Sequence, residues 1–309
     1  MEYVIPVLIN DASLLSSNIA LPDATESGYT VWAIGQSISI GDIRRYETDD
    51  KHWIVRALQA HTTSALNAPT GQDDDTFWVK LREVNRWRMF DSGSTSQSEN
   101  ADSIEVSLAI SGAVNAIYFG NLDADSISVE MLDINDNVVY SRTFELTDST
   151  AIYDWYTYMF APFATMHDLY VNDIPIYYQS TINITITKTG SVAKCGVCAI
   201  GQRRYVGFTE YGKLKWGIRS YSVKEVNEFG DTILTRRKSK RIATVSAMVA
   251  SGNEDALVED LRERDGYAIV FIVVDKFRTT YIYGFYRDFY ASAIYPSHSE
   301  FNFEVEELA

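Results

Sequence analysis

Apolar and polar residues alternate through the middle of the chain. Residues 103–110 (SIEVSLAI) show the pattern most clearly, with an apolar side chain at every second position. Because a strand points successive side chains to opposite faces, this alternation predicts a sheet with one buried face. Further strands are expected in AIYFGNL, SISVEMLDI, VVYSRTFEL, TINITITKTG and KCGVCAIG, with turns at Asn121, Asn135–Asn137 and Gly190. The spacing predicts an antiparallel β-sandwich, jelly-roll-like, over 83–201.

The last hundred residues combine strands with one helix. Residues 252–266 (GNEDALVEDLRERDG) predict this helix, which Asn253 can cap and Gly266 can stop. Its apolar stripe consists of Leu257, Val258 and Leu261. One strand (RIATVSAMVA) precedes it, and YAIVFIVVD, TTYIYGFYRDFY and SEFNFEVEEL follow. Residues 202–309 are therefore expected to form an α+β domain, with the helix against an antiparallel sheet.

The N-terminal part is less regular. An apolar run from Tyr3 to Ile9 predicts a strand that pairs with a later segment, so 1–25 is interpreted as a strand and arm. Between 26 and 82, single aromatic residues stand among small polar ones, which predicts a small module of short strands. The alternative is a polar loop anchored by tryptophans. The aromatic residues concerned are Trp32, Tyr46, Trp53 and Trp78.

Composition supports a mainly-β protein. Aromatic residues make up 13% of the 309 residues and there are only 6 prolines, a balance typical of sheets. The net charge of −15 argues against nucleic acid as a bulk partner. No apolar stretch reaches the length of a membrane span, and the acidic start does not resemble a secretory signal. We therefore expect assembly in the cytoplasm.

Few residues point to catalysis or cofactor binding. Cys195-x-x-Cys198 lies among β-forming residues, where positions three apart should face opposite ways, so buried small hydrophobes are favoured over a redox or zinc site. Asp133-x-Asn135-x-Asn137 begins like a calcium loop, but Val138 and Phe144 stand where such a loop has glycine and glutamate, so a hairpin turn is favoured. Motifs for nucleophilic catalysis and phosphate binding are absent. No enzyme activity, metal or cofactor is expected.

One basic run stands out in this acidic chain. Residues 236–241 (RRKSKR) hold five cations: Arg236, Arg237, Lys238, Lys240 and Arg241. Contact with nucleic acid is one interpretation, although no aromatic residues interleave the run for base stacking. Docking onto an acidic neighbour, including another copy of the chain, is favoured. A solvated edge strand is the third possibility.

Several segments, in order, resemble a family of bacteriophage tail proteins. They are NRWRMFD, VVYSRTFEL, DWYTYMFAPF, CGVCAIGQ, GFTEYGKLKWGIRSYSVKEVNEFGD, RRKSKR, YGFYRDF and YPSHSEFNFEVEEL, so the resemblance covers roughly 30–309. The module at 26–82 is similar to a small chitin-binding type module, although the usual Tyr-x-x-Gly-Asp start is IGQSISIGD here. In such a module Trp32, Tyr46, Trp53 and Trp78 would contact sugar. The C-terminal unit is similar to the tube-forming domain of distal tail and baseplate proteins.

The resemblance implies a structural role in a tail tip or baseplate. The expected partners are further copies of the chain in a ring, neighbouring tail-tube, hub and fibre proteins, and DNA only as it passes through the channel. The expected location is the virion tail. The alternative is an adhesin of the virion that binds a host-surface glycan.

The same resemblance gives two local expectations. Residues 85–91 (NRWRMFD) are interpreted as a domain join, with Trp87, Met89 and Phe90 buried and the arginines at the seam or a subunit contact. The five cations of RRKSKR are expected mainly at contacts between subunits, facing acids such as those in 303–307. The alternative for these cations is the channel wall.

Overall fold

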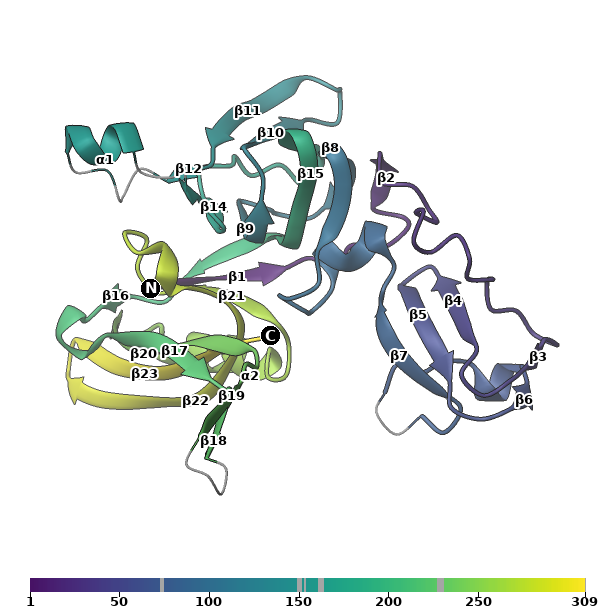
Figure 1. Cartoon of the computed structure of the whole chain (residues 1–309). Helices are drawn as coiled ribbons and strands as arrows, with labels where there is room; N and C mark the ends of the chain where they lie inside the picture. The colour runs from purple at the N-terminus through teal and green to yellow at the C-terminus, as the bar shows by residue number, and fades with distance from the viewer. Residues whose placement is uncertain (73–74, 149–151, 153, 161–163, 227–230, 309) are drawn as a thin grey trace.

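The computed structural model describes residues 1–308 except 73–74, 149–151, 153, 161–163 and 227–230 (Figure 1). In this part of the chain there are twenty-three strands, two α-helices and four short 3-10 helices. The expected mainly-β class is therefore confirmed.

The sandwich has two β layers, and one long strand belongs to both. Its strands are β2 (Leu14–Ser17), β8 (Ser98–Ser111), β9 (Ala116–Asp123), β10 (Ser126–Leu132), β11 (Val138–Glu145), β14 (Leu169–Val171) and β15 (Gln179–Tyr205). The first layer has the order β11-β10-β15-β8-β2, while β9 joins β14 to the second half of β15. Ile184 pairs with Val106 and Val129, and all three are buried, as the alternation predicts.

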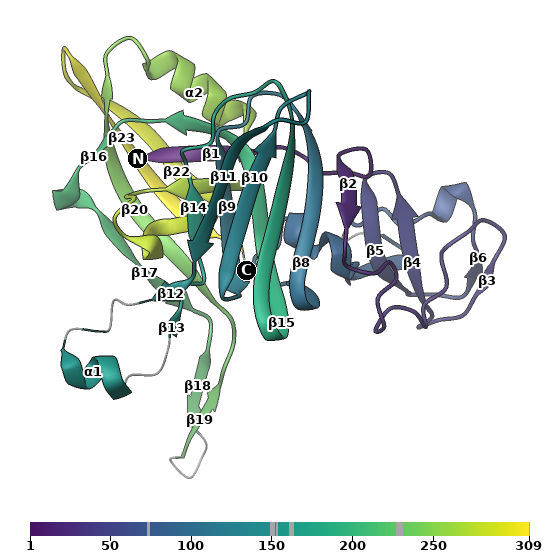
Figure 2. The same cartoon turned by 90° about the horizontal axis from the view of Figure 1, so that it is seen from above.

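The C-terminal part is a sheet covered by one helix. Its main elements are β20 (Ser239–Ala250), α2 (Glu254–Glu263), β21 (Ile269–Ile272), β22 (Tyr281–Tyr295) and β23 (His298–Glu307). The strand order is β21-β22-β23-β20, and β16 (Phe208–Thr209) and β17 (Lys215–Ser220) pair with the outer edge of β20. Leu257 and Leu261 of α2 are buried against this sheet (Figure 2). The single covering helix and its apolar stripe agree with the sequence.

Strand β1 (Glu2–Pro6) connects the two larger parts. It lies between β15 and β21 and pairs antiparallel with both (Figure 1). Val4 is fully buried in the contact between the parts, together with Tyr118 from the sandwich and Ile272 from the C-terminal sheet. The predicted pairing of the N-terminal strand with later segments is therefore confirmed.

The small module has its own compact core. It contains β3 (Ser37–Ile38), β4 (Ile43–Thr48), β5 (Lys51–Ala57), β6 (His61–Thr62), η1 (Ala65–Asn67) and β7 (Trp78–Glu83). The sheet β4-β5-β7 stands beside the pair β3-β6. Ile38, Val55, Ala57 and Trp78 form the buried centre. Short strands around an aromatic cluster are what the sequence predicts here.

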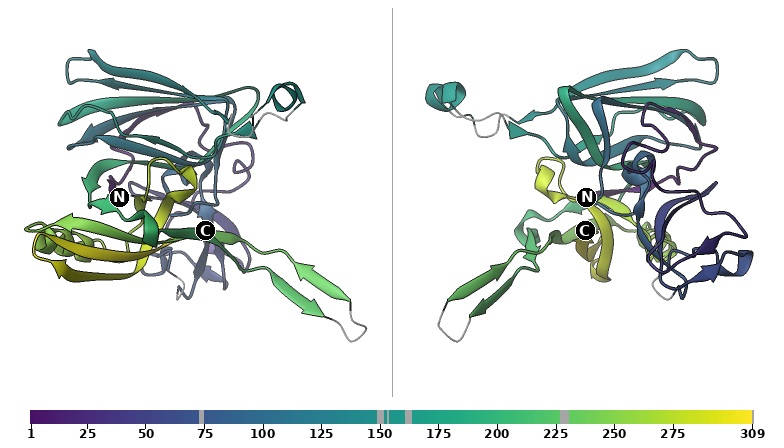
Figure 3. Two further views of the ribbon diagram at one scale, coloured as in Figure 1. Left: turned by 90° about the vertical axis from the view of Figure 1, so that its left-hand side faces the viewer. Right: turned by 45° about the vertical axis from the view of Figure 1, so that its right-hand side comes forward.

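Two extensions project from the body of the molecule (Figure 3). One carries α1 (Trp155–Phe160) between the short strands β12 (Thr147–Asp148) and β13 (Ala164–Thr165). The other is the hairpin of β18 (Val223–Val226) and β19 (Thr232–Thr235). The remaining short elements are η2 (Asn85–Phe90), η3 (Tyr211–Lys213) and η4 (Arg278–Thr280).

Three local expectations were wrong. Asn121 and Gly190 lie inside β9 and β15, where positive φ angles of 51° and 72° mark irregular pairing instead of chain reversals. Asn253 precedes α2 but its side chain makes no capping hydrogen bond. A carboxylate oxygen of Glu254 instead accepts the backbone N–H of Gly252.

Candidate functional site

Trp87 and Met89 are buried at the junction between the small module and the sandwich. Both lie on η2 and belong to the main core, which also includes Ile54 from the module. The Trp87 ring stacks on His52 of β5, with the ring centroids 4.1 Å apart. Phe90 is partly buried against the same core. The segment therefore lies where the module meets the sandwich, as expected, and its backbone is a 3-10 helix.

Both arginines of this segment are held within the chain. Arg88 forms an ion pair with Glu26, with 3.0 Å between Nη2 and Oε1, and both residues are buried. Glu26 also accepts the backbone N–H of Asn85. Arg86 donates two hydrogen bonds to the carbonyl oxygen of Ile19, at 2.9 and 2.6 Å. The arginines therefore fix the N-terminal arm to the junction.

His52 is a titratable group inside this junction. Its Nε2 lies 3.3 Å from a carboxylate oxygen of Asp11. Burial lowers the pKa of His52, and the nearby charges of Asp11 and Glu47 oppose this effect while Arg86 adds to it. The imidazole is therefore held in its neutral form, stacked on Trp87.

Three of the aromatic residues expected to bind sugar form a row on the module. The Tyr46 ring contacts both Trp32 and Trp53, with centroid separations of 5.4 and 6.0 Å. All three side chains are half-buried. The row therefore keeps part of each ring accessible, which stacking on a sugar requires.

The fourth residue expected to bind sugar, Trp78, is less accessible than the three in the row. Trp78 is buried in the core of the module, and its Nε1 donates to the carbonyl oxygen of Asn67 at 2.8 Å. It therefore offers no ring face to a ligand. The Trp53 ring is itself approached by the ammonium groups of Lys51 and Lys80, 5.1 and 4.8 Å from its centroid. These cations compete with a ligand for that ring.

The basic run divides into two groups. Arg236, Arg237 and Lys238 are exposed where the projecting hairpin returns to β20. Lys238 donates to Thr95 Oγ1 at 2.9 Å. Within the described residues, neither Arg236 nor Arg237 forms an ion pair. These two side chains are free to meet an acidic partner.

Lys240 and Arg241 are paired within the chain. The Nζ of Lys240 lies 3.4 Å from Glu306, and Arg241 lies 2.9 Å from Asp168 and 3.6 Å from Glu307. The acids of 303–307 are thus among the partners expected for the basic run, but they come from the same chain. Antiparallel pairing of β20 with β23 brings these two cations to those acids within one chain, and the expected contact between subunits stays a prediction.

Arg241 also connects the C-terminal sheet to the sandwich. Its Nη1 donates to the carbonyl oxygen of Tyr281 at 3.0 Å, while Asp168 belongs to the sandwich. The same Asp168 accepts a hydrogen bond of 2.7 Å from the buried Tyr118 hydroxyl. The charge of Arg241 is therefore compensated by Asp168, and both side chains make further hydrogen bonds at the contact, as a partly buried ion pair requires.

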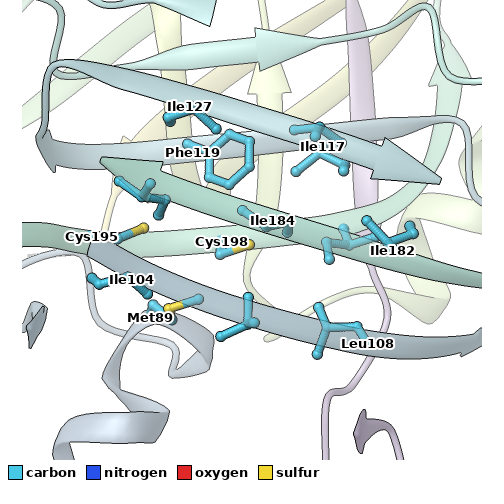
Figure 4. Close-up of a cluster of buried hydrophobic side chains, with 14 of the residues drawn as sticks. Met89, Ile104, Leu108, Ile117, Phe119, Ile127, Ile182, Ile184, Cys195 and Cys198 are labelled. Atoms are coloured by element: carbon cyan, nitrogen blue, oxygen red, sulfur yellow. The ribbon is translucent and has the colours of Figure 1, made fainter. Parts of the chain in front are cut away.

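Cys195 and Cys198 are free thiols in one hydrophobic cluster (Figure 4). The expectation that they face opposite ways was wrong. Asn121 of β9 lies opposite Gly196 of β15 and has a left-handed backbone. At this point the alternation of inward-facing and outward-facing side chains shifts in both strands, so Cys195 and Cys198 both face the cluster. Burial raises the pKa of Cys195 to about 12 and that of Cys198 well above its ordinary value. Neither thiol is an activated nucleophile.

The calcium-like loop is a hairpin turn. The Asp133 carboxylate accepts the backbone N–H groups of Asn135 and Asn137 at 2.8 and 2.9 Å. The sequence also has an acidic run at 73–75 (DDD), of which Asp73 and Asp74 lie outside the described residues. Among the residues that the structure describes, no group of three or more His, Cys, Asp or Glu side chains is placed to hold a metal ion. None of the helices described is long and apolar enough to cross a membrane.

The most exposed aromatic cluster lies on α1, outside every site expected from the sequence. Five side chains between Trp155 and Phe160 are exposed, with Trp155 at 80% and Phe160 at 71%. The sequence does contain a signal, because six consecutive residues, WYTYMF, carry no charge. Tyr153 and Phe163 of the same aromatic segment lie outside the described residues.

No protein-family model, curated protein or solved structure matches this chain.

Proposed function

We propose that the chain is a structural, non-enzymatic component of a bacteriophage tail tip or baseplate. It works as a ring that joins the tail tube to fibres or host-recognition proteins. The ordered resemblance to phage tail proteins over roughly 30–309 motivates the proposal. After assembly in the host cytoplasm, the protein is located in the virion tail.

The observation that carries this proposal is the pair of exposed extensions. On the hairpin, Ile233 and Leu234 are exposed by 52% and 67%, and α1 exposes its aromatic side chains. Ile233 and Leu234 are consecutive strand residues and therefore expose one apolar side chain on each face of the hairpin. The exposed apolar side chains of α1 are clustered, and contiguous apolar surface of this kind is uncommon on monomers and marks contacts with other proteins. An assembly would bury both extensions.

Complementation of a phage that lacks this gene tests the proposal. The double variant Ile233→Ser/Leu234→Ser should give particles without complete tails, because the hairpin loses its apolar contact. Leu66→Ser is the matched control, since Leu66 is 99% exposed but lies on the small module. Normal tails from the hairpin variant would contradict the proposed contact. Normal tails without any copy of the chain would contradict the function itself.

The second candidate function is glycan binding by the virion. The half-buried row of Trp32, Tyr46 and Trp53 favours it, because sugars stack on accessible aromatic faces. A glycan array probed with the full chain and with Trp32→Ala tests this function. Binding that is lost in the variant supports an adhesin, whereas absence of binding at millimolar ligand leaves the structural role.

A further inference from the structure

A groove with apolar walls lies beside α2. Its volume is about 530 Å³, and its lining includes Val249 from β20 and Leu257 from α2. Tyr205 and Phe208 stand at its edge with their rings 6.0 Å apart, and both are largely exposed. Pockets of about 300–1,000 Å³ accept drug-sized molecules, so this groove has room for aromatic side chains.

The α1 helix has the side chains that such a groove accepts. Trp155 and Tyr158 contact each other edge to face, and Tyr156 contacts Phe160. All four rings are exposed to solvent. Tryptophan and tyrosine are the residue types that dominate the binding energy of protein interfaces. The helix and the groove are therefore chemically complementary surfaces on one chain.

Charge supports the same pairing. Arg204 lines the groove, is exposed, and has no ion pair among the described residues. The groove's own acid, Asp260, accepts a hydrogen bond from Tyr3 and lies 3.9 Å from Arg264. Asp154, immediately before α1, is an exposed carboxylate whose pKa is lowered by hydrogen bonds from Thr157. An anion next to α1 and a free cation at the groove favour one orientation of docking.

In the structure the helix does not occupy the groove of its own chain. Figures 2 and 3 show α1 and α2 far apart, on opposite sides of the C-terminal sheet. In this arrangement a contact between α1 and the groove joins two copies, and it is head-to-tail because the two surfaces differ. Head-to-tail contacts close into rings when the rotation permits.

We propose that α1 of one copy binds in the groove beside α2 of the next copy, so that repetition of this contact closes the ring. The inference rests on the proposed function in one respect, namely that the chain works as a ring. It adds the surfaces that meet and their order around the ring.

Disulfide trapping in the full chain tests the contact. Two proteins are mixed, one with Met159→Cys on α1 and the other with Ala256→Cys in the groove. A disulfide requires Cα atoms within about 7 Å, so a linked dimer reports docking directly. Relative to a control mixture of Leu66→Cys with Ala256→Cys, we expect about tenfold more linked dimer, equivalent to about 1.4 kcal/mol. The buried native cysteines do not need to be removed.

A second variant separates docking from random collision. Arg204→Glu in the groove protein should lower the yield of linked dimer several-fold, because it places an anion against Asp154. Circular dichroism establishes that each variant is folded. Equal yields in the test and control mixtures, or a yield that Arg204→Glu does not change, would overturn the proposal.

The remaining outcomes distinguish the inference from the function. If electron microscopy shows rings in the virion but no disulfide forms between the two variant proteins, this contact is contradicted and the proposed function stays intact. Absence of rings contradicts both. Binding of the chain to phosphatidylcholine vesicles that is lost in Trp155→Ser would assign α1 to a membrane and would also overturn the proposal.

Discussion

At the scale of the residue, Gly201 shows how closely β15 passes β1. Gly201 pairs with Pro6, and a Cβ atom here would overlap the carbonyl group of Ile5. Because that carbonyl is part of the backbone, Gly201→Ala should destabilise the fold by about 1–3 kcal/mol. Gly217→Ala in β17 is the control, since its Cβ meets nothing within 4 Å. The urea midpoint should fall only for Gly201→Ala, and equal midpoints would contradict the close approach.

His52 gives a prediction for pH. Its pKa in the folded chain is lowered by burial, so the folded state binds fewer protons than the unfolded state, whose histidines have a pKa of about 6.5. Neutral His52 therefore contributes fully to the free energy of unfolding above the unfolded-state pKa. This contribution is lost as the pH falls from the unfolded-state pKa toward the lower pKa of the folded state. The free energy of unfolding should fall less between pH 7.5 and 5 in His52→Phe, which keeps a ring on Trp87. Identical pH profiles would count against a neutral His52.

Single residues also show the limit of a sequence pattern. The burial of Trp87 and Met89 at a join was expected from the resemblance to phage tail proteins. The burial of Cys195 and Cys198 in one cluster was not predictable. It depends on a left-handed residue, Asn121, in the neighbouring strand, and alternation within one strand carries no information about its neighbour.

At the scale of the element, Arg241 of β20 is central to the contact between the C-terminal sheet and the sandwich. Arg241→Met would leave Asp168 and Glu307 without their cation. Because the arginine side chain is partly exposed, we expect a loss of about 2–4 kcal/mol, at or below the cost of breaking a fully buried pair. Arg142→Met is the control, because its ion pair with Asp173 is exposed and surface ion pairs contribute little to stability. Chemical denaturation of both variants measures the difference, and similar small losses would contradict the role of Arg241.

Strand positions were largely predictable, and their partners were not. Alternation located β8 and β10, and the apolar stripe located α2, because each of these elements buries one face. The acids that pair with Lys240 and Arg241 depend on the register between β20 and β23, which no local pattern contains. The exposed helix α1 was missed as an element because its apolar residues have no buried face to give them a period.

At the scale of the whole molecule, the chain combines a continuous body of two packed parts with exposed extensions. The sandwich and the C-terminal sheet share β1 and a buried contact, while α1 and the β18–β19 hairpin project outward (Figure 1). A net charge of −15 opposes self-association unless cations meet acids locally. Arg204, Arg236 and Arg237, which have no ion pairs among the residues described, are suited to that role.

The most direct test of the central claim is electron cryo-microscopy of the purified virion that contains this chain. We expect the chain to form a ring at the end of the tail, with the hairpin and α1 buried between neighbouring proteins. Density for the chain in the capsid shell, or its absence from the particle, would contradict the account.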